Sequence, residues 1–136
     1  MEAIAWDRVH VFWGDERAVE PTHPDSNYRM ASETLLDALT IPESNIHRIE
    51  GEHGAETAAL RYEQVLHEFF GDEGIRFDVL HLGMGSDGHT ASLFPGSPAL
   101  DESDRFAIDT LAPPASPIQD RVTLTFPALN SARTTL

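Results

Sequence analysis

The chain has 136 residues, no cysteine and a formal net charge of −14. This length fits one domain with a sizeable core, and the absence of cysteine excludes disulfides, zinc–thiolate sites and thiol catalysis. The acidic charge disfavours nucleic acid as a partner, because nucleic-acid backbones are anionic. No apolar run reaches the length of a membrane span and the first residues lack a signal-peptide pattern. We therefore expect no membrane association and a cytoplasmic location.

Strand patterns alternate with helical patterns along the chain. Strands are expected at 7–13, 46–50, 77–84, 105–111 and 121–126, and helices at 25–39 and 55–70. Asp25 or Ser26 is suited to cap the first helix. Alternation of this kind predicts an α/β fold with a mostly parallel sheet, and no linker divides the chain, so residues 1–136 are expected to form one domain.

Two polar segments follow predicted strands directly. They are "GDER" at 14–17 and "GSDGHTAS" at 85–92. In α/β sheets ligands bind beyond the carboxyl ends of the strands, so these two segments are the candidate site.

The second segment begins within a G-x-G-x-x-G pattern formed by Gly83, Gly85 and Gly88. A dinucleotide-binding loop with this pattern must open a helix long enough to cross the sheet. Only six residues separate Gly88 from Pro95, and proline ends a helix. The spacing therefore disfavours a dinucleotide site.

His89 is the alternative centre of this loop. Histidine is suited to proton transfer near neutral pH, and Asp87 is placed to hydrogen-bond one ring nitrogen and leave the other for chemistry. The glycines let the backbone approach a ligand closely, and free N–H groups from Thr90 to Ser92 at the mouth of a short helix are suited to hold an anion. The competing interpretation is that His89 only caps a helix or packs in a loop.

"GDER" also allows two interpretations. Arg17 has the fork-shaped group that matches two phosphate oxygens, whereas Asp15, Glu16 and Arg17 together could be an ordinary solvated charge cluster. The other histidines show no metal-ligand spacing; they are His10, His23, His47, His53, His67 and His81.

Three stretches together resemble the 6-phosphogluconolactonase family: "VHVFWGDERAVEPTHPDSNYRMASETLL" at 9–36, "HLGMGSDGHTASLFPGSPAL" at 81–100 and "RVTLTFPALNSAR" at 121–133. The related glucosamine-6-phosphate deaminases share the fold. They normally have "DEY" where this chain has "DER", and an Asn-Glu-Pro element where it has Leu93-Phe94-Pro95. Both differences favour the lactonase.

The resemblance implies a Rossmann-like sheet with helices on both faces, as in the isomerase/deaminase fold. It implies hydrolysis of 6-phospho-D-glucono-1,5-lactone to 6-phospho-D-gluconate, in the pentose phosphate pathway, without cofactor or metal. His89 would be the general base and Asp87 its support, while Arg17 would bind the phosphate of the sugar-phosphate lactone. The other substrate-binding residues expected from the resemblance are Asp15, Gly83, Gly85, Gly88 and Thr90.

Two alternatives remain beside the lactonase. One is a glucosamine-6-phosphate isomerase/deaminase, in which Asp15 would abstract a proton from the substrate. The other is an inactive fragment, since family members are longer, with a Gly-Gly-Ser-Thr-Pro loop upstream and a lysine downstream. For the same reason residues 1–136 are expected to be a single partial domain that lacks both ends of the fold, with exposed sheet edges, low stability and weak or no activity alone. The oligomeric state is left open.

Overall fold

The computed structural model describes residues 3–136. The helices are α1 (Asn27–Thr34), α2 (Ala55–Phe70) and α3 (Phe126–Leu129). The strands are β1 (Val11–Phe12), β2 (Asp15–Arg17), β3 (Ile46–His47), β4 (Val79–Leu80), β5 (Ala107–Leu111), β6 (Asp120–Leu124) and β7 (Thr134–Thr135). Single 3-10 turns lie at Trp6–Arg8, Leu36–Ala38, Glu43–Asn45, Gly51–His53, Gly71–Glu73 and Pro98–Asp101.

The strands form three small sheets. β1 pairs with β3 and β4 with β7 in parallel, as expected for strands joined through helical crossovers. The third sheet, in the order β2-β6-β5, is antiparallel. β5 and β6 are joined by a short loop, which permits an antiparallel hairpin but no parallel pairing. The predicted α/β class is confirmed, with parallel pairing in two of the sheets, whereas the strands expected at 105–111 and 121–126 pair in the antiparallel direction.

The two predicted helices agree with the structure to different degrees. The helix expected at 55–70 is confirmed at both ends as α2. α1 stops at Thr34, because Leu35 has non-helical backbone angles (φ −138°, ψ −57°) and a 3-10 turn follows. Ser26 caps α1, its side chain accepting a hydrogen bond from the backbone N–H of Arg29 at 3.1 Å. The sequence therefore identified the start of this helix but overestimated its length.

The first and third predicted strands are much shorter than expected. Residues 6–8 form a 3-10 turn, and only β1 and β4 remain paired within 7–13 and 77–84. Each of these strands pairs along one edge only within the described residues, so little of either segment is held in a ladder. The last predicted strand ends early because Phe126 begins α3, with Pro127 in the first turn of that helix.

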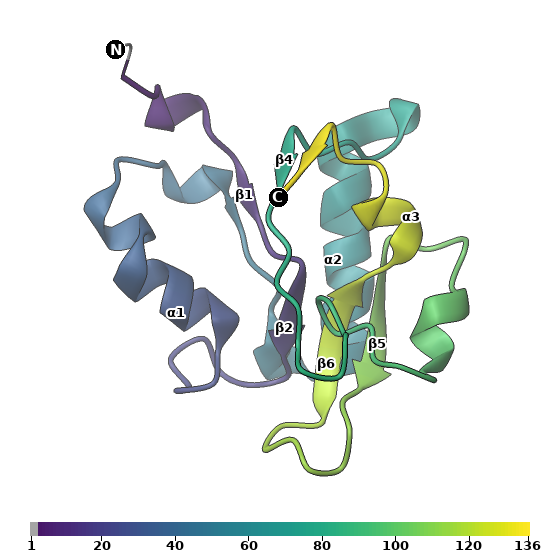
Figure 1. Ribbon diagram of the computed structural model, residues 1–136. Helices are drawn as coiled ribbons and strands as arrows, with labels where there is room; N and C mark the ends of the chain where they lie inside the picture. Colours follow the sequence, from purple (N-terminus) through teal and green to yellow (C-terminus); the bar gives the residue numbers. More distant parts are fainter. Residues whose placement is uncertain (1–2) are drawn as a thin grey trace.

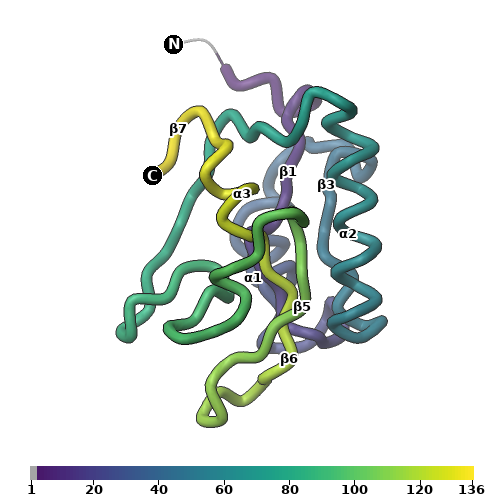
Figure 2. Tube along the Cα trace, turned by 90° about the vertical axis from the view of Figure 1, so that its right-hand side faces the viewer, coloured from purple at the N-terminus to yellow at the C-terminus, as the bar shows by residue number. Residues whose placement is uncertain are grey.

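The antiparallel sheet lies between α2 and the segment 83–100. α2 covers one face, and the segment 83–100 passes over the other (Figures 1 and 2). Tyr62 on α2 is fully buried, and its hydroxyl donates to the carbonyl of Trp13 and accepts from the N–H of the same residue, both at 2.9 Å. This contact anchors α2 to the chain just after β1. Within residues 3–136 no helix has the length and apolar character needed to cross a bilayer.

A groove of about 690 Å³ separates β1 from β4. Its walls come from both strands and from aromatic side chains, namely Phe12, Trp13, Phe69, Phe70 and Phe77. Val79 in β4 is 53% exposed. Open strand edges therefore lie on the two sides of this groove. Such exposed edges are the reason for which low stability was expected.

Glu16 in β2 is a buried carboxylate that holds the start of α1. Its side chain is 2% exposed and accepts hydrogen bonds from the N–H groups of Asn27 and Tyr28 at 2.8 and 2.9 Å. It also accepts from the hydroxyl of Ser26 at 3.0 Å and from the N–H of Arg17 at 2.8 Å. A carboxylate at a helix N-terminus satisfies free N–H groups and the helix dipole. Glu16 is therefore a structural residue and no part of a solvated cluster.

Replacing Glu16 with alanine should lower the free energy of unfolding by roughly 3 kcal/mol, because one buried and three partly buried donors lose their acceptor. Urea denaturation followed by circular dichroism measures this change. The matched control is Glu33→Ala, which removes an exposed helical ion pair with Arg29 (2.8 Å) and should cost at most about 0.5 kcal/mol. Equal losses in the two variants would contradict the structural role.

Two histidines meet beside β1 and β3. Nδ1 of His10 and Nε2 of His47 lie 3.0 Å apart, and the two rings are stacked. Phe12 stacks on His47 with ring centroids 4.4 Å apart, and Phe69 packs against both histidines. Burial, and secondarily the neighbouring His10, lower the pKa of His47 from its ordinary value of 6.5.

This pair should make stability depend on pH. Because the pKa of His47 is lower in the folded chain than in the unfolded chain, the unfolded chain binds more protons and acidification favours unfolding. The free energy of unfolding should therefore fall as the pH is lowered from about 6.5, and His47→Gln should flatten this dependence. Urea midpoints at pH 7.5 and 5.5 measure it, with the exposed His53→Gln as control. An unchanged slope in His47→Gln would rule the pair out as its source.

Candidate active site

The loop after β4 is folded around the ring of His89. The N–H of Gly85 donates to the carbonyl of His89 at 2.8 Å, and the N–H of Gly88 donates to the carbonyl of Gly85 at 3.0 Å. Gly88 has φ +86°, which favours glycine. A Cβ atom on Gly85 would overlap Nδ1 and Cε1 of the imidazole. The close approach that the glycines allow is therefore an approach to the histidine ring.

His89 and Asp87 form a hydrogen-bonded pair. Nδ1 of His89 lies 2.6 Å from Oδ1 of Asp87, and the N–H of His89 donates to the same oxygen at 3.0 Å. The hydrogen bond from the backbone N–H of His89, and secondarily the one to its ring, hold the pKa of the Asp87 carboxyl below its usual range. An ionised Asp87 favours a proton on Nδ1 and leaves Nε2 as the nitrogen free to accept one.

No helix begins after Gly88, and that expectation is wrong. Residues 90–93 form a tight turn in which Thr90 and Leu93 make an isolated bridge and the N–H of Leu93 donates to the carbonyl of Thr90 at 2.9 Å. Ala91 has φ +49°, the one positive value outside glycine among the described residues. The N–H of Ser92 donates to Oγ1 of Thr123 at 3.1 Å, so it is not free to bind an anion.

Two arginines face one another across β2 and β6. Arg17 and Arg121 are register partners in this antiparallel pair, so their side chains lie on the same face. Nη1 of Arg17 donates to the carbonyl of Asp25 at 2.7 Å, while its buried Nε has no partner. Nε of Arg121 donates to the carbonyl of Ile118 at 2.9 Å, and none of the described residues accepts from its two terminal nitrogens.

The electrostatics of this arginine pair favour an anion. Arg121 is 7% exposed, and burial, then the charge of Arg17, lower the pKa of its guanidinium. Two neighbouring guanidinium groups repel each other. An anion bound between them offsets this repulsion and accepts hydrogen bonds from their unused donors. A phosphate or carboxylate fits this arrangement, because its oxygens match the arginine forks.

Phe94 and Ser92 join the histidine loop to the arginine pair. The ring of Phe94 lies 4.6 Å from the His89 ring and 5.9 Å from Cζ of Arg121. Oγ of Ser92 donates to Oδ2 of Asp15 at 2.7 Å. The two polar segments expected at one edge of the fold are therefore in contact.

Several predicted site residues have defined places in this arrangement. His89, Asp87 and Arg17 lie in one connected cluster, whereas the carboxylate of Asp15 binds Ser92 and the amide of Asn27. The hydroxyl of Thr90 donates to the carbonyl of Gly83 at 2.8 Å, which ties both residues into the loop.

The sequence patterns indicated no role for Phe94 or Thr123, and for Ser92 they indicated only an anion-binding N–H and no role for its hydroxyl. They placed Arg121 at a strand start, and the missing signal was the strand register that pairs Arg121 with Arg17.

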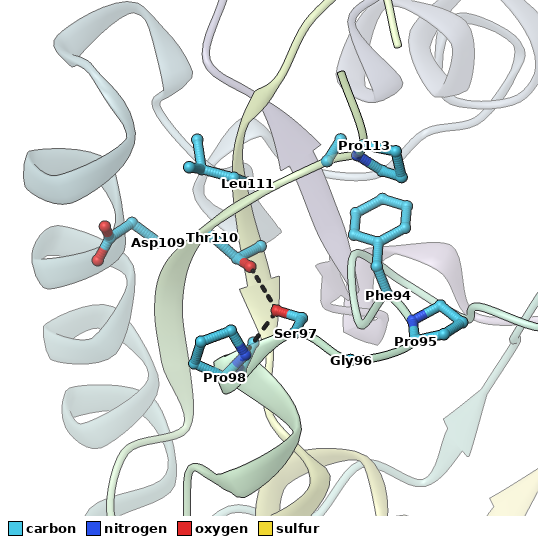
Figure 3. A pocket seen from close by; sticks show the side chains of 11 residues that line it. Phe94, Pro95, Gly96, Ser97, Pro98, Asp109, Thr110, Leu111 and Pro113 are labelled. Carbon is cyan, nitrogen blue, oxygen red and sulfur yellow. Dashed lines mark hydrogen bonds between the residues drawn. The ribbon is translucent and has the colours of Figure 1, made fainter. Parts of the chain in front are cut away.

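A second cavity of about 480 Å³ lies beside Phe94. Figure 3 shows the Phe94 ring next to Pro113, with Ser97 and Thr110 directed toward one another. Their hydroxyl oxygens are 3.3 Å apart. A dinucleotide-binding loop is followed about 20 residues later by an acidic residue that binds the ribose. Asp109 has that position in the sequence, but its side chain points away from the cavity. Over residues 3–136, no three histidine, cysteine, aspartate or glutamate side chains are grouped to hold a metal ion.

Known proteins match this chain over almost all of its length. The profile of the family described as glucosamine-6-phosphate isomerases/6-phosphogluconolactonase matches residues 1–136. A 6-phosphogluconolactonase of Synechocystis sp. is 46% identical over 136 residues, which cover 97% of this chain and 55% of that protein. One from Nostoc sp. is 44% identical over 135 residues, with 96% and 55% covered.

Solved structures give the same result. The crystal structure of 6-phosphogluconolactonase from Thermotoga maritima superposes with a TM-score of 0.84 and is 35% identical, over 98% of this chain and 58% of that chain. The fold expected from the sequence resemblance is therefore confirmed. The chain spans about half the length of the curated relatives it matches.

Gly85→Ala should displace the His89 ring, because the added methyl group would occupy the position of the imidazole. The backbone of Gly85 lies outside the left-handed region, so alanine adds no backbone strain, and the clash falls on the His89 ring and on Oδ1 of Asp87. Nitrogen-15 NMR of the imidazole should show the loss of the Nδ1 hydrogen bond to Asp87. Gly83→Ala is the matched control, since nothing lies within 4 Å of its added methyl. Identical imidazole signals in both variants would contradict the packing.

Proposed function

Because the chain belongs to the family of glucosamine-6-phosphate isomerases and 6-phosphogluconolactonases, we propose that it hydrolyses 6-phospho-D-glucono-1,5-lactone to 6-phospho-D-gluconate. The observation that carries the proposal is the His89–Asp87 pair in one cluster with two arginines that have unused donors. A base and an anion site together suit a substrate with a labile ester at one end and a phosphate at the other.

In the proposed reaction Nε2 of His89 takes a proton from water as the water oxygen attacks the lactone carbonyl. The ionised Asp87 stabilises the imidazolium that forms, as a carboxylate does beside a catalytic histidine. The tetrahedral intermediate collapses by breaking the bond between the carbonyl carbon and the ring oxygen. The imidazolium then returns its proton to that oxygen, which gives a hydroxyl group and a carboxylic acid that ionises.

Arg17 and Arg121 are proposed to bind the substrate phosphate. Nη2 of Arg17 and the terminal nitrogens of Arg121 make no hydrogen bond with the described residues and supply donors on one face of the sheet. The N–H groups of Gly85 and Gly88 are bonded within the loop, so their proposed contribution is to shape the loop and not to bind the oxyanion.

The isomerase/deaminase alternative requires Asp15 as a free base. Oδ1 of Asp15 accepts a hydrogen bond from the amide of Asn27 at 3.1 Å, and Oδ2 accepts one from Ser92 at 2.7 Å. Both bonds occupy the oxygens that would abstract a proton. This geometry favours the lactonase over the deaminase.

The purified chain should accelerate acid release from the lactone above the spontaneous rate, as measured in a pH-stat. His89→Gln should reduce the enzymatic rate by about 10²- to 10⁴-fold, the usual contribution of a general base. Arg121→Met should raise KM and weaken binding of inorganic phosphate, which calorimetry measures. His53→Gln is the control, because this exposed histidine lies outside the cluster.

The outcomes separate the three functions. Ammonia release from glucosamine-6-phosphate, without lactone hydrolysis, would establish the deaminase. Phosphate binding without hydrolysis would indicate a chain that retains the anion site but lacks catalysis. Hydrolysis that His89→Gln leaves unchanged would overturn the assignment of the base.

A further inference from the structure

The face of β2 and β6 that carries the arginines also carries a second pair of polar residues. Asp15 is the register partner of Thr123, and Arg17 is the partner of Arg121. Residues two apart in a strand point to the same side, so these four side chains lie on one face in two successive rows. The rows are roughly 6.8 Å apart, since a strand advances about 3.4 Å per residue.

The Asp15–Thr123 row binds the loop that carries His89. Both contacts are made by Ser92, which is completely buried. Its hydroxyl donates to Asp15 at 2.7 Å and its N–H donates to Oγ1 of Thr123 at 3.1 Å. The Thr123 hydroxyl donates to the carbonyl of Leu124 at 2.9 Å, which turns an oxygen lone pair toward Ser92.

The path from Ser92 to His89 is short and rigid. It runs through Ala91, whose left-handed backbone is held by the bond from the N–H of Leu93 to the carbonyl of Thr90. The Thr90 hydroxyl fixes the other end to the carbonyl of Gly83. A change in the position of Ser92 is therefore transmitted to the imidazole.

We propose that Ser92, held by Asp15 and Thr123, is a positioning residue that fixes the distance between His89 and the arginine pair. This role rests on the proposed hydrolysis, in which His89 acts at the carbonyl while Arg17 and Arg121 hold the phosphate. Ser92 itself contacts no substrate, because it is fully buried. Asp15 acts through Ser92 in the same way, and its contribution differs from the direct substrate contact that the family resemblance implied.

Three variants test this role in the intact chain. Ser92→Ala removes the donor to Asp15, and Thr123→Val removes the acceptor for the N–H of Ser92 at almost constant volume. Thr123→Ser keeps the hydroxyl and should restore wild-type behaviour. The matched control is Ser32→Ala, which removes an exposed serine–aspartate hydrogen bond of 2.9 Å to Asp37.

Ser92→Ala and Thr123→Val should lower kcat for lactone hydrolysis by 10-fold or more, because a displacement of about 1 Å at a reacting group costs on the order of 100-fold. KM and the Kd for inorganic phosphate should change less than threefold, since the arginine row is intact. Thr123→Ser and Ser32→Ala should retain kcat within about twofold. Because a fraction of unfolded chain would also lower the apparent kcat without changing KM, kcat is expressed per folded chain, measured by circular dichroism.

Imidazole NMR gives a readout that does not depend on turnover. The His89 ring signals should shift in Ser92→Ala and Thr123→Val and keep their wild-type positions in Thr123→Ser. If the wild-type chain shows no hydrolysis, the proposed function fails, and the ring signals alone decide the positioning role. Wild-type ring signals in both Ser92→Ala and Thr123→Val, or a loss confined to KM, would overturn it.

Discussion

The antiparallel register of β2 against β6 is the constraint on which the candidate site depends. It sets Arg17 opposite Arg121 and Asp15 opposite Thr123, on one face of one small sheet. A slip of one residue in β2 would turn Asp15 and Arg17 to the opposite face and leave Arg121 and Thr123 in place, because side chains alternate between faces along a strand. Arg17 would then be separated from Arg121, and Asp15 could no longer hold Ser92 in the loop that carries His89.

Glu16 secures this register from the opposite face. Its carboxylate binds the N-terminus of α1 through the N–H groups of Asn27 and Tyr28, so the short strand β2 is joined to a helix as well as to β6. The three charged residues of "GDER" thus serve three purposes. Asp15 holds a loop, Glu16 holds a helix, and Arg17 keeps donors for a ligand. Neighbouring charged residues in a strand have different roles here, because their side chains face different surroundings.

The sequence predicted the local features of this protein better than the distant ones. α2 was predicted at both ends, because its apolar stripe has helical spacing, and the Asp87–His89 contact spans only two residues. The bond between Ser92 and Asp15 joins residues 77 positions apart, and no local pattern encodes it. The turn at 90–93 was mistaken for a helix because no sequence pattern indicates the left-handed backbone of Ala91 or the bond from Ser92 to Thr123 on another strand. The pairing of the two arginines likewise required the sheet register.

The absence of lysine has a consequence for ligand binding. An anion site built from arginine stays cationic throughout the pH range in which proteins are folded, even though burial lowers the pKa of Arg121. A phosphate monoester, in contrast, loses its second proton near pH 6. Affinity at the arginine pair should therefore rise with pH as the ligand becomes a dianion, and it follows the charge of the ligand and not that of the protein.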